Sequence, residues 1–315
     1  MKHIKLLYLF LLISWSSLPL QAADYLLQSP NGKLTVEIET KGQLSYTLKH
    51  NSQTLLDKSP IGLLLEDKIL GEDIKISRIK RNSSVKEHIV SPHYRLPSFE
   101  VTYNELNLKF KGNYGIIFRA YNEGIAYRFY TTMKGPLIIK DEMVQMNFPK
   151  DYPTFMSYST MPTGEDQYAM AFQNLYTKSS IKGVDTNNIA FLPITIDCGN
   201  ELKMTLLESD LEDYPGMFIK GDGKNTSLQG TFAHYPSEIK NFPPRAMKRI
   251  TKRTDYIART TGERNYPWRI WAITEKDTEM PVNNLVYALA SPNRIGDCSW
   301  IKTGKVAWDW WNDWG

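Results

Sequence analysis

Hydrophobic and polar side chains alternate with a period of two along most of the chain. Residues 34–39 alternate in this way, residues 44–48 do so again, and Lys41-Gly42 supplies a turn between them. Because successive side chains of a β-strand point to opposite faces, the pattern predicts a β-hairpin. Similar runs occur at residues 74–79, 99–103, 106–110, 115–121, 125–131, 143–148, 189–197, 202–208, 228–235 and 267–274.

The alternating runs are short, and turn residues separate them without regular intervening helices. Such a succession predicts an all-β fold, a large antiparallel β-sandwich from Asp24 to about Thr274. One later segment, residues 282–290, has helical spacing instead. The apolar residues that would share one face of this helix are Val282, Leu285, Val286 and Leu289.

The first 23 residues have the composition of a secretory leader. Lys2 and Lys5 form a charged start, residues 6–18 are apolar, and two alanines precede Asp24. The apolar run is shorter than a typical membrane span. We therefore expect a signal peptide at residues 1–23, a periplasmic or secreted protein, and no membrane span after cleavage.

A change of composition after Ser291-Pro292 divides the rest of the chain. Residues 24–280 are expected to form the β-sandwich domain, and residues 281–304 a linker that contains the short helix. Residues 305–315 would then begin a second domain.

The charge balance argues against a nucleic-acid partner. The formal net charge is +4, and two of the basic residues lie in the leader, which leaves +2. The densest basic stretch, residues 245–253, is expected to be a solvated strand or loop.

Cys198 and Cys298 could form a disulfide after export or remain two separate buried thiols. The five histidines show no zinc-ligand spacing.

Tryptophan is concentrated near Gly315. Residues 308–314 hold four of the eight tryptophans, interleaved with Asp and Asn. Indole rings that alternate with carboxylates suit a wall that stacks on sugar rings and binds their hydroxyl groups. The pattern makes Trp308, Asp309 and Trp311 candidate substrate-binding residues, and a tryptophan-rich surface strand or interface is the alternative.

An acidic segment follows the strand expected at residues 202–208. Residues 208–213 contain four carboxylates and precede a Pro-Gly turn. Carboxylate oxygens are ligands that Ca²⁺ prefers, although the spacing is not that of an EF-hand. Taken alone, the segment is more typical of a solvated strand end with an Asx-type turn.

Other segments carry polar groups without a committed catalytic pattern. Arg119 and Arg128 flank a tight turn and could pair with carboxylates, while residues 166–177 form a polar, aromatic connection. The chain has no Gly-x-Ser-x-Gly, phosphate-loop or dinucleotide motif. Acid–base catalysis by paired carboxylates stays open, but no pair is identified.

Five segments in the same order resemble glycoside hydrolase family 97, mostly exported bacterial enzymes that cleave α-galactosides or α-glucosides. They are residues 27–34, 121–129, 208–217, 267–269 and 299–312. The resemblance covers essentially the whole chain after the leader. It implies an N-terminal β-super-sandwich of the galactose-mutarotase-like type, a (β/α)₈ barrel and a small C-terminal β-domain. Residues 305–315 would be the first strand of a truncated barrel.

The same resemblance implies where the chemistry lies. The catalytic carboxylates of such enzymes lie further along the barrel, so no catalytic residue of this chain is implied. A calcium ion helps such enzymes to bind substrate, and Glu208 matches the glutamate ligand that the sandwich supplies. Residues 307–312 look more like the retaining α-galactosidase branch than the inverting α-glucosidase branch.

The implied function is therefore the N-terminal part of an exported α-glycosidase that acts on an oligosaccharide or polysaccharide. A non-catalytic carbohydrate-binding sandwich is one alternative. A structural or interaction domain at the cell surface is another.

Overall fold

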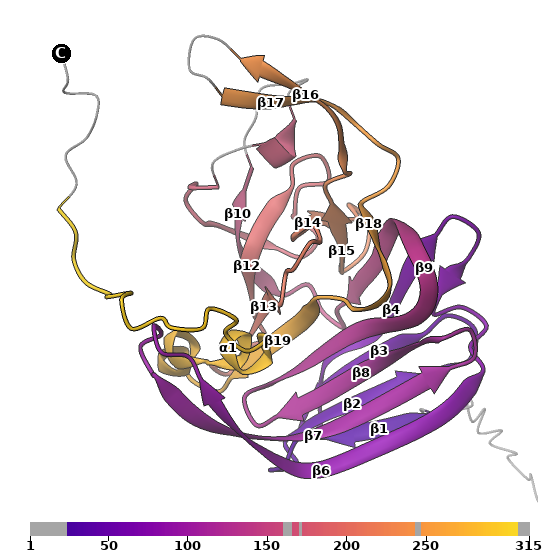
Figure 1. Ribbon diagram of the computed structural model, residues 1–315. Coiled ribbons are helices and arrows are strands. Elements are labelled where there is room, and N and C mark those ends of the chain that lie inside the picture. The colour runs from indigo at the N-terminus through magenta and orange to yellow at the C-terminus, as the bar shows by residue number, and fades with distance from the viewer. Residues whose placement is uncertain (1–23, 160–165, 170–171, 243–246, 308–315) are drawn as a thin grey trace, which may run out of the picture.

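The computed structural model of this chain is almost entirely β (Figure 1). It describes residues 24–159, 166–169, 172–242 and 247–307. Within these ranges every strand pair is antiparallel, which confirms the class predicted from the alternating pattern. Continuous pairing links 17 strands, while β16 (Pro236–Phe242) and β17 (Met247–Arg253) form a separate ribbon.

The strands follow one another with few helical segments between them. The first nine are β1 (Tyr25–Gln28), β2 (Leu34–Glu39), β3 (Ser45–His50), β4 (Gln53–Leu65), β5 (Ile69–Leu70), β6 (Ile76–Val90), β7 (Ser98–Phe110), β8 (Tyr114–Tyr121) and β9 (Gly124–Asn147). Those between β9 and the ribbon are β10 (Pro153–Tyr158), β11 (Thr177–Ser180), β12 (Ala190–Asp197), β13 (Lys203–Ser209), β14 (Met217–Gly221) and β15 (Ser227–Phe232). After the ribbon come β18 (Ala258–Asn265) and β19 (Trp268–Thr274). The described helical segments are η1 (Gln167–Ala169), η2 (Asp277–Val282) and α1 (Leu285–Leu289).

The predicted hairpin is present as β2 and β3. The two strands pair antiparallel with Val36 opposite Leu48, and both side chains are buried. Alternate residues of β2 are buried in the main apolar core, as the period of two requires. The hydrophobic pattern therefore fixes which face of this sheet turns inward.

The longest strand, β9, replaces two shorter strands expected at residues 125–131 and 143–148. It is 24 residues long and pairs along its length with β4, β8, β15, β18 and β19. Gly135, with φ of 75°, lies where the register against β18 shifts. Its positive φ forms a bulge rather than the turn that a Gly-Pro pair suggests, so the strand continues.

The described α-helix is shorter than predicted. It begins at Leu285 instead of Val282, because Asn283 accepts a hydrogen bond from the Leu285 backbone N–H through its Oδ1, at 3.1 Å. Val282 belongs to η2 and is half-exposed, so its expected place on the packed face was wrong. Leu285 and Leu289 pack with a second apolar cluster on β7, β8 and β19.

The stretch expected to open a barrel is only partly described. Residues 305–307 have no regular secondary structure, and Val306 is 87% exposed. Residues 308–315 lie outside the described ranges. The truncated barrel strand and the domain boundaries at 280 and 304 therefore stay predictions.

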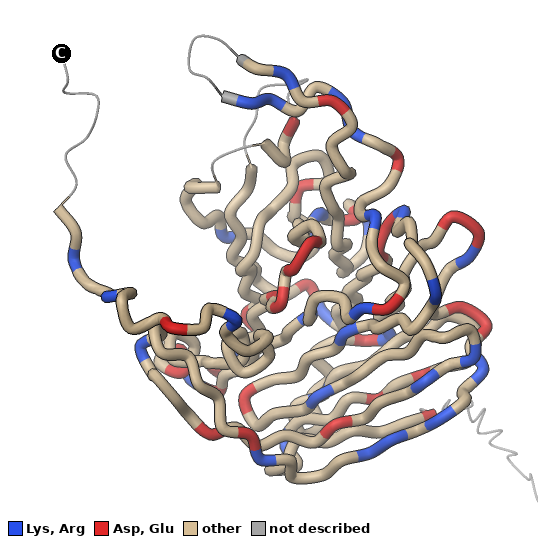
Figure 2. Tube along the Cα trace, viewed as in Figure 1, with Lys and Arg blue, Asp and Glu red and all other residues tan. Residues whose placement is uncertain are grey.

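Several further sequence-based expectations can be compared with the fold. Cys198 and Cys298 are both free thiols, and burial raises the pKa of Cys198 to about 12. No helix within the described ranges is long and apolar enough to cross a membrane. The basic residues at 247–253 form strand β17, and Figure 2 shows them on the ribbon that projects from the body.

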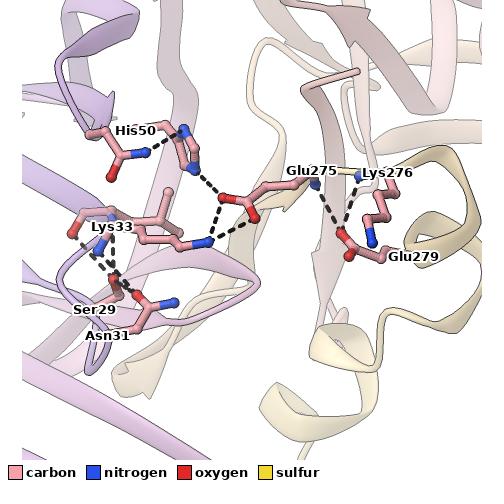
Figure 3. A network of polar contacts seen from close by, with 9 residues as sticks. Ser29, Asn31, Lys33, His50, Glu275, Lys276 and Glu279 are labelled. Atoms are coloured by element: carbon pink, nitrogen blue, oxygen red, sulfur yellow. Dashed lines mark hydrogen bonds and ion pairs between the residues drawn. The ribbon is translucent and has the colours of Figure 1, made fainter. Parts of the chain in front are cut away.

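An exposed ionic network joins the first strands to the segment after β19 (Figure 3). Lys33 Nζ lies 2.8 Å from both carboxylate oxygens of Glu275, and His50 Nε2 lies 2.8 Å from Oε1. Glu279 in turn accepts hydrogen bonds from the backbone N–H groups of Glu275 and Lys276. The network therefore ties β2 and β3 to the start of η2.

Candidate functional site

Glu208 lies near the end of β13, which pairs antiparallel with β19 in the same sheet. Its Cα partner across the ladder is Arg269. Leu207, the preceding residue, packs with the cluster beneath α1. Because side chains alternate along a strand, Glu208 points to the opposite face, toward the interior at the rim of the sandwich.

Arg269 holds two carboxylates at once. Its Nη1 donates to Glu208 Oε2 at 2.6 Å, while Nε and Nη2 donate to the two oxygens of Glu142 at 2.9 and 2.6 Å. The side chains of Arg269, Glu142 and Glu208 are 1%, 4% and 11% exposed. Glu208 is therefore the member of this triad that reaches closest to the surface.

The triad has an unequal charge balance. One guanidinium faces two carboxylates, so the cluster keeps one formal negative charge when all three groups are ionised. Burial raises the pKa of Glu208, and the guanidinium of Arg269 works in the opposite direction. Burial alone would lower the pKa of Arg269, but Glu142 and Glu208 raise it overall, so its charge is secure. A cation beside Glu208 would be attracted by the uncompensated charge.

The two oxygens of Glu208 are not equivalent. Oε2 accepts from Arg269 and also from the Met217 backbone N–H at 3.1 Å. Among the described residues, Oε1 accepts only the longer branch from the same N–H, at 3.3 Å. Gly216 lies beside Oε1, because a Cβ added to this glycine would lie 3.2 Å from that oxygen. Because residue 216 is glycine, no Cβ occupies this position beside Oε1.

The other carboxylates of the acidic segment have different partners. Asp210 Oδ2 accepts from Arg128 Nη2 at 3.0 Å, and its Oδ1 accepts from the Ser291 backbone N–H. Glu212 Oε1 accepts from Arg294 at 2.7 Å. The described residues contain no group of three or more His, Cys, Asp or Glu that could hold a metal ion. Asp210 and Glu212 are thus engaged in ion pairs with arginines, while Glu208 is bound by Arg269.

The two arginines that flank the turn between β8 and β9 both pair with carboxylates, which the sequence left open. Arg128 pairs with Asp210, and Arg119 Nε donates to Glu105 Oε2 at 2.9 Å. Both guanidinium groups also lie over the Trp268 ring, at 4.8 and 5.1 Å from its centroid. These contacts fix the loop that follows Glu208 against the strand pair β8–β9.

The polar connection near residue 166 borders a hollow with a volume of about 750 Å³. Asp166 Oδ2 accepts two hydrogen bonds from Arg253, at 2.9 and 2.6 Å, and the Tyr168 hydroxyl lies 2.9 Å from Thr231 Oγ1. The hollow has the size of a small-molecule site. Arg253, one of the two arginines that line the hollow, is paired with Asp166, so these contacts point to no particular ligand.

The remaining candidate residues cannot be placed. Trp308, Asp309 and Trp311 lie outside the described residues, so their role in substrate binding stays a prediction. In contrast, sequence reasoning missed Glu142 entirely and gave Arg269 no role. One signal was available: Arg269 is the single charged residue in the run Trp268–Thr274, all of which is buried. A charge in such a strand requires a buried partner.

Comparison with known proteins decides the family. The family model described as Glycosyl-hydrolase 97 N-terminal matches residues 27–292. The chain belongs to this family. It is 37% identical, over 98% of its length, to a retaining α-galactosidase of Bacteroides thetaiotaomicron, and the match covers 48% of that enzyme. The chain therefore spans about half the length of this curated relative.

Solved structures of glycoside hydrolase family 97 have the same fold. An enzyme of this family from Pseudoalteromonas sp. strain K8, in complex with acarbose, superposes with a TM-score of 0.71 at 19% identity. The match covers 88% of this chain and 40% of that one. A β-arabinopyranosidase gives a TM-score of 0.66 at 17% identity, over 80% of this chain and 40% of its own. At such identities the likeness supports the shared sandwich fold alone.

Proposed function

We propose that this chain is the N-terminal sandwich domain of an exported glycosidase that cleaves α-galactosides. The observation that carries the proposal is the 37% identity to a retaining α-galactosidase across 98% of this chain. The substrate would be an oligosaccharide or polysaccharide with a terminal α-linked sugar. α-Glucosides are the second substrate class, because the family resemblance includes both.

The reaction would be carried out outside this domain. Retaining glycosidases use two carboxyl groups about 5 Å apart, one as nucleophile and one as acid and base. We propose that both groups belong to a (β/α)₈ barrel that follows the sandwich and begins near residue 305. Trp308, Asp309 and Trp311 would lie on its first strand and contact the sugar. This chain alone should therefore be inactive.

The sandwich would contribute one ligand to a calcium site. Glu208 fits this role because Oε1 is the less engaged oxygen, has no side chain at Gly216 beside it, and belongs to a cluster with a net negative charge. When bound, calcium would fix sugar hydroxyl groups relative to the reacting bond. The further ligands would come from the barrel, because Asp210 and Glu212 are already paired.

The test uses the full-length enzyme, meaning this chain together with the barrel proposed to follow it. Hydrolysis of p-nitrophenyl α-galactoside should exceed that of the α-glucoside, and NMR should show retention at the anomeric carbon. Faster cleavage of the α-glucoside would reassign the substrate. A full-length protein that binds sugars without turnover would instead indicate a non-catalytic binding module.

Calcium dependence tests the role of Glu208 separately. The variant Glu208→Gln replaces a charged carboxylate by a neutral amide, so it should weaken both calcium binding and substrate affinity. An unchanged calcium requirement in this variant would reject Glu208 as a ligand.

Export is tested by N-terminal sequencing of the secreted or periplasmic protein, which should begin at Asp24.

A further inference from the structure

We propose that Arg269 and Gly216 together position Glu208 so that it binds the cation through one chosen oxygen, Oε1. The inference rests on the proposed calcium site and concerns how this chain prepares its own ligand. Arg269 does not touch the cation in this proposal. It acts by fixing the orientation of Glu208, and Gly216 acts by leaving the required space.

The first step of the argument is the rigidity of Arg269. Two of its donors bind both oxygens of Glu142 in a fork, which fixes the plane of the guanidinium. The guanidinium also lies over the ring of Phe232, with Arg269 Cζ 5.1 Å from the ring centroid. Arg269 is 1% exposed and Glu142 4%, so water does not compete for these contacts.

The second step is the unequal hydrogen bonding of the two carboxylate oxygens of Glu208. Nη1 binds Oε2 at 2.6 Å, and the Met217 backbone N–H adds a second bond to the same oxygen at 3.1 Å. Within the described part of the chain, Oε2 therefore has two donors, while Oε1 has only the 3.3 Å branch from Met217. A carboxylate held in this way has Oε1 as its less engaged oxygen.

The third step is the space around Oε1. Gly216 has no positive φ that would demand glycine, so its backbone could accept another residue. A Cβ there would lie 3.2 Å from Oε1, closer than side chains normally approach an oxygen. Glycine at this position thus serves access to Oε1. Glu142 and Arg269 have no direct access to a ligand, so their effect must pass through Glu208.

The experiment measures the calcium affinity of the full-length enzyme by isothermal titration calorimetry, with folding checked by circular dichroism. Arg269→Lys keeps the positive charge but loses the fork, and should weaken calcium binding about 10-fold, as loss of partners behind a metal ligand typically does. Gly216→Ala should crowd Oε1 and weaken binding with no change of charge. Gly296→Ala is the matched control, because a Cβ at Gly296 meets nothing within 4 Å.

Outcomes for the inference and for the proposed function differ. If Glu208→Gln binds calcium like the wild type, the calcium site itself is wrong and the inference falls with it. If Glu208→Gln loses calcium while either Arg269→Lys or Gly216→Ala binds within about twofold of the wild type, only the inference is overturned. An equal loss in Gly296→Ala would also overturn it.

A crystal structure of the wild-type enzyme with calcium keeps the inference testable if Arg269→Lys fails to fold. Calcium bound through Oε1, with Oε2 still on Arg269, is the expected result. Calcium bound through Oε2, or through both oxygens, would overturn the inference.

Discussion

Two ionic networks connect distant parts of this chain, and they differ mainly in their exposure to water. The triad of Arg269, Glu142 and Glu208 is almost fully buried. In the network of Figure 3, the side chains of Lys33 and Glu275 are 46% and 44% exposed. Both networks have contacts of similar length, so distance alone does not distinguish them. Breaking the buried triad should therefore cost much stability, because it leaves a buried charge unpaired. Water and salt weaken the ion pairs of the exposed network.

The largest effect should follow from removing the centre of the buried triad. Arg269→Met would leave Glu142 buried without its counter-charge, which typically costs about 3–5 kcal/mol of the free energy of unfolding. Urea unfolding of this chain would measure the loss. Arg294→Met, which removes an exposed partner of Glu212, serves as the control and should change stability by less than about 0.5 kcal/mol. Similar losses in both variants would contradict the comparison.

A double variant separates two causes of destabilisation: the loss of the ion pair, and the burial of a carboxylate that has lost its counter-charge. Arg269→Met combined with Glu142→Leu removes the deeply buried charge as well, since Glu208 lies nearer the surface. The double variant should recover about 2 kcal/mol relative to Arg269→Met alone. Additive losses in the same urea experiment would show that Glu142 is solvated after all.

The exposed network should contribute much less and should respond to salt. Glu275→Gln is expected to cost at most about 1 kcal/mol at low ionic strength. In about 1 M salt the Debye length falls to roughly 3 Å, so the difference from the wild type should nearly disappear. The loss caused by Arg269→Met should persist in the same buffer. Thermal unfolding at the two salt concentrations would show whether the networks differ in this way.

The smallest expected effect is the pH dependence of the stability that Glu275 contributes. Hydrogen bonds from Lys33 and then from His50 hold the pKa of Glu275 below its ordinary value of 4.5. A lowered pKa in the folded state means that the carboxylate stabilises the fold above pH 4.5, and that this contribution disappears as the pH falls through the folded-state pKa. The difference in Tm between wild type and Glu275→Gln should therefore shrink from pH 7 to pH 3. A difference in Tm that stays constant with pH would show that it does not come from the ionised carboxylate of Glu275.

The fold class was predictable because burial in a sheet imposes a period of two. Strand β18, which the sequence pattern did not predict, is one in which this signal is weak. In β18 the buried positions are Ala258, Thr260 and Gly262, which are too small or too polar to mark a core face. The predicted helix start was wrong for a local reason, because the side chain of Asn283 accepts a hydrogen bond from the Leu285 backbone N–H.

The candidate site was only half predictable. Glu208 could be proposed from family resemblance, since it lies in a continuous motif. Its partners could not, because Arg269 is 61 residues from Glu208 and 127 residues from Glu142. Contacts at such separations depend on which strands become neighbours in the sheet, and alternation within a strand does not specify its neighbours. The unused signal was the charge of Arg269 within an otherwise uncharged, buried strand.

The long strand β9 also affects how this domain can form. Its partners β4 and β8 precede it, but β15, β18 and β19 follow, the last of them ending at Thr274. During synthesis, β9 would emerge long before these later strands are available, with much of its edge unpaired. Pairing across such separations slows folding, because loops must close before contacts compensate for the lost entropy. The sandwich should therefore fold as one late cooperative unit, after the ribosome has passed residue 274.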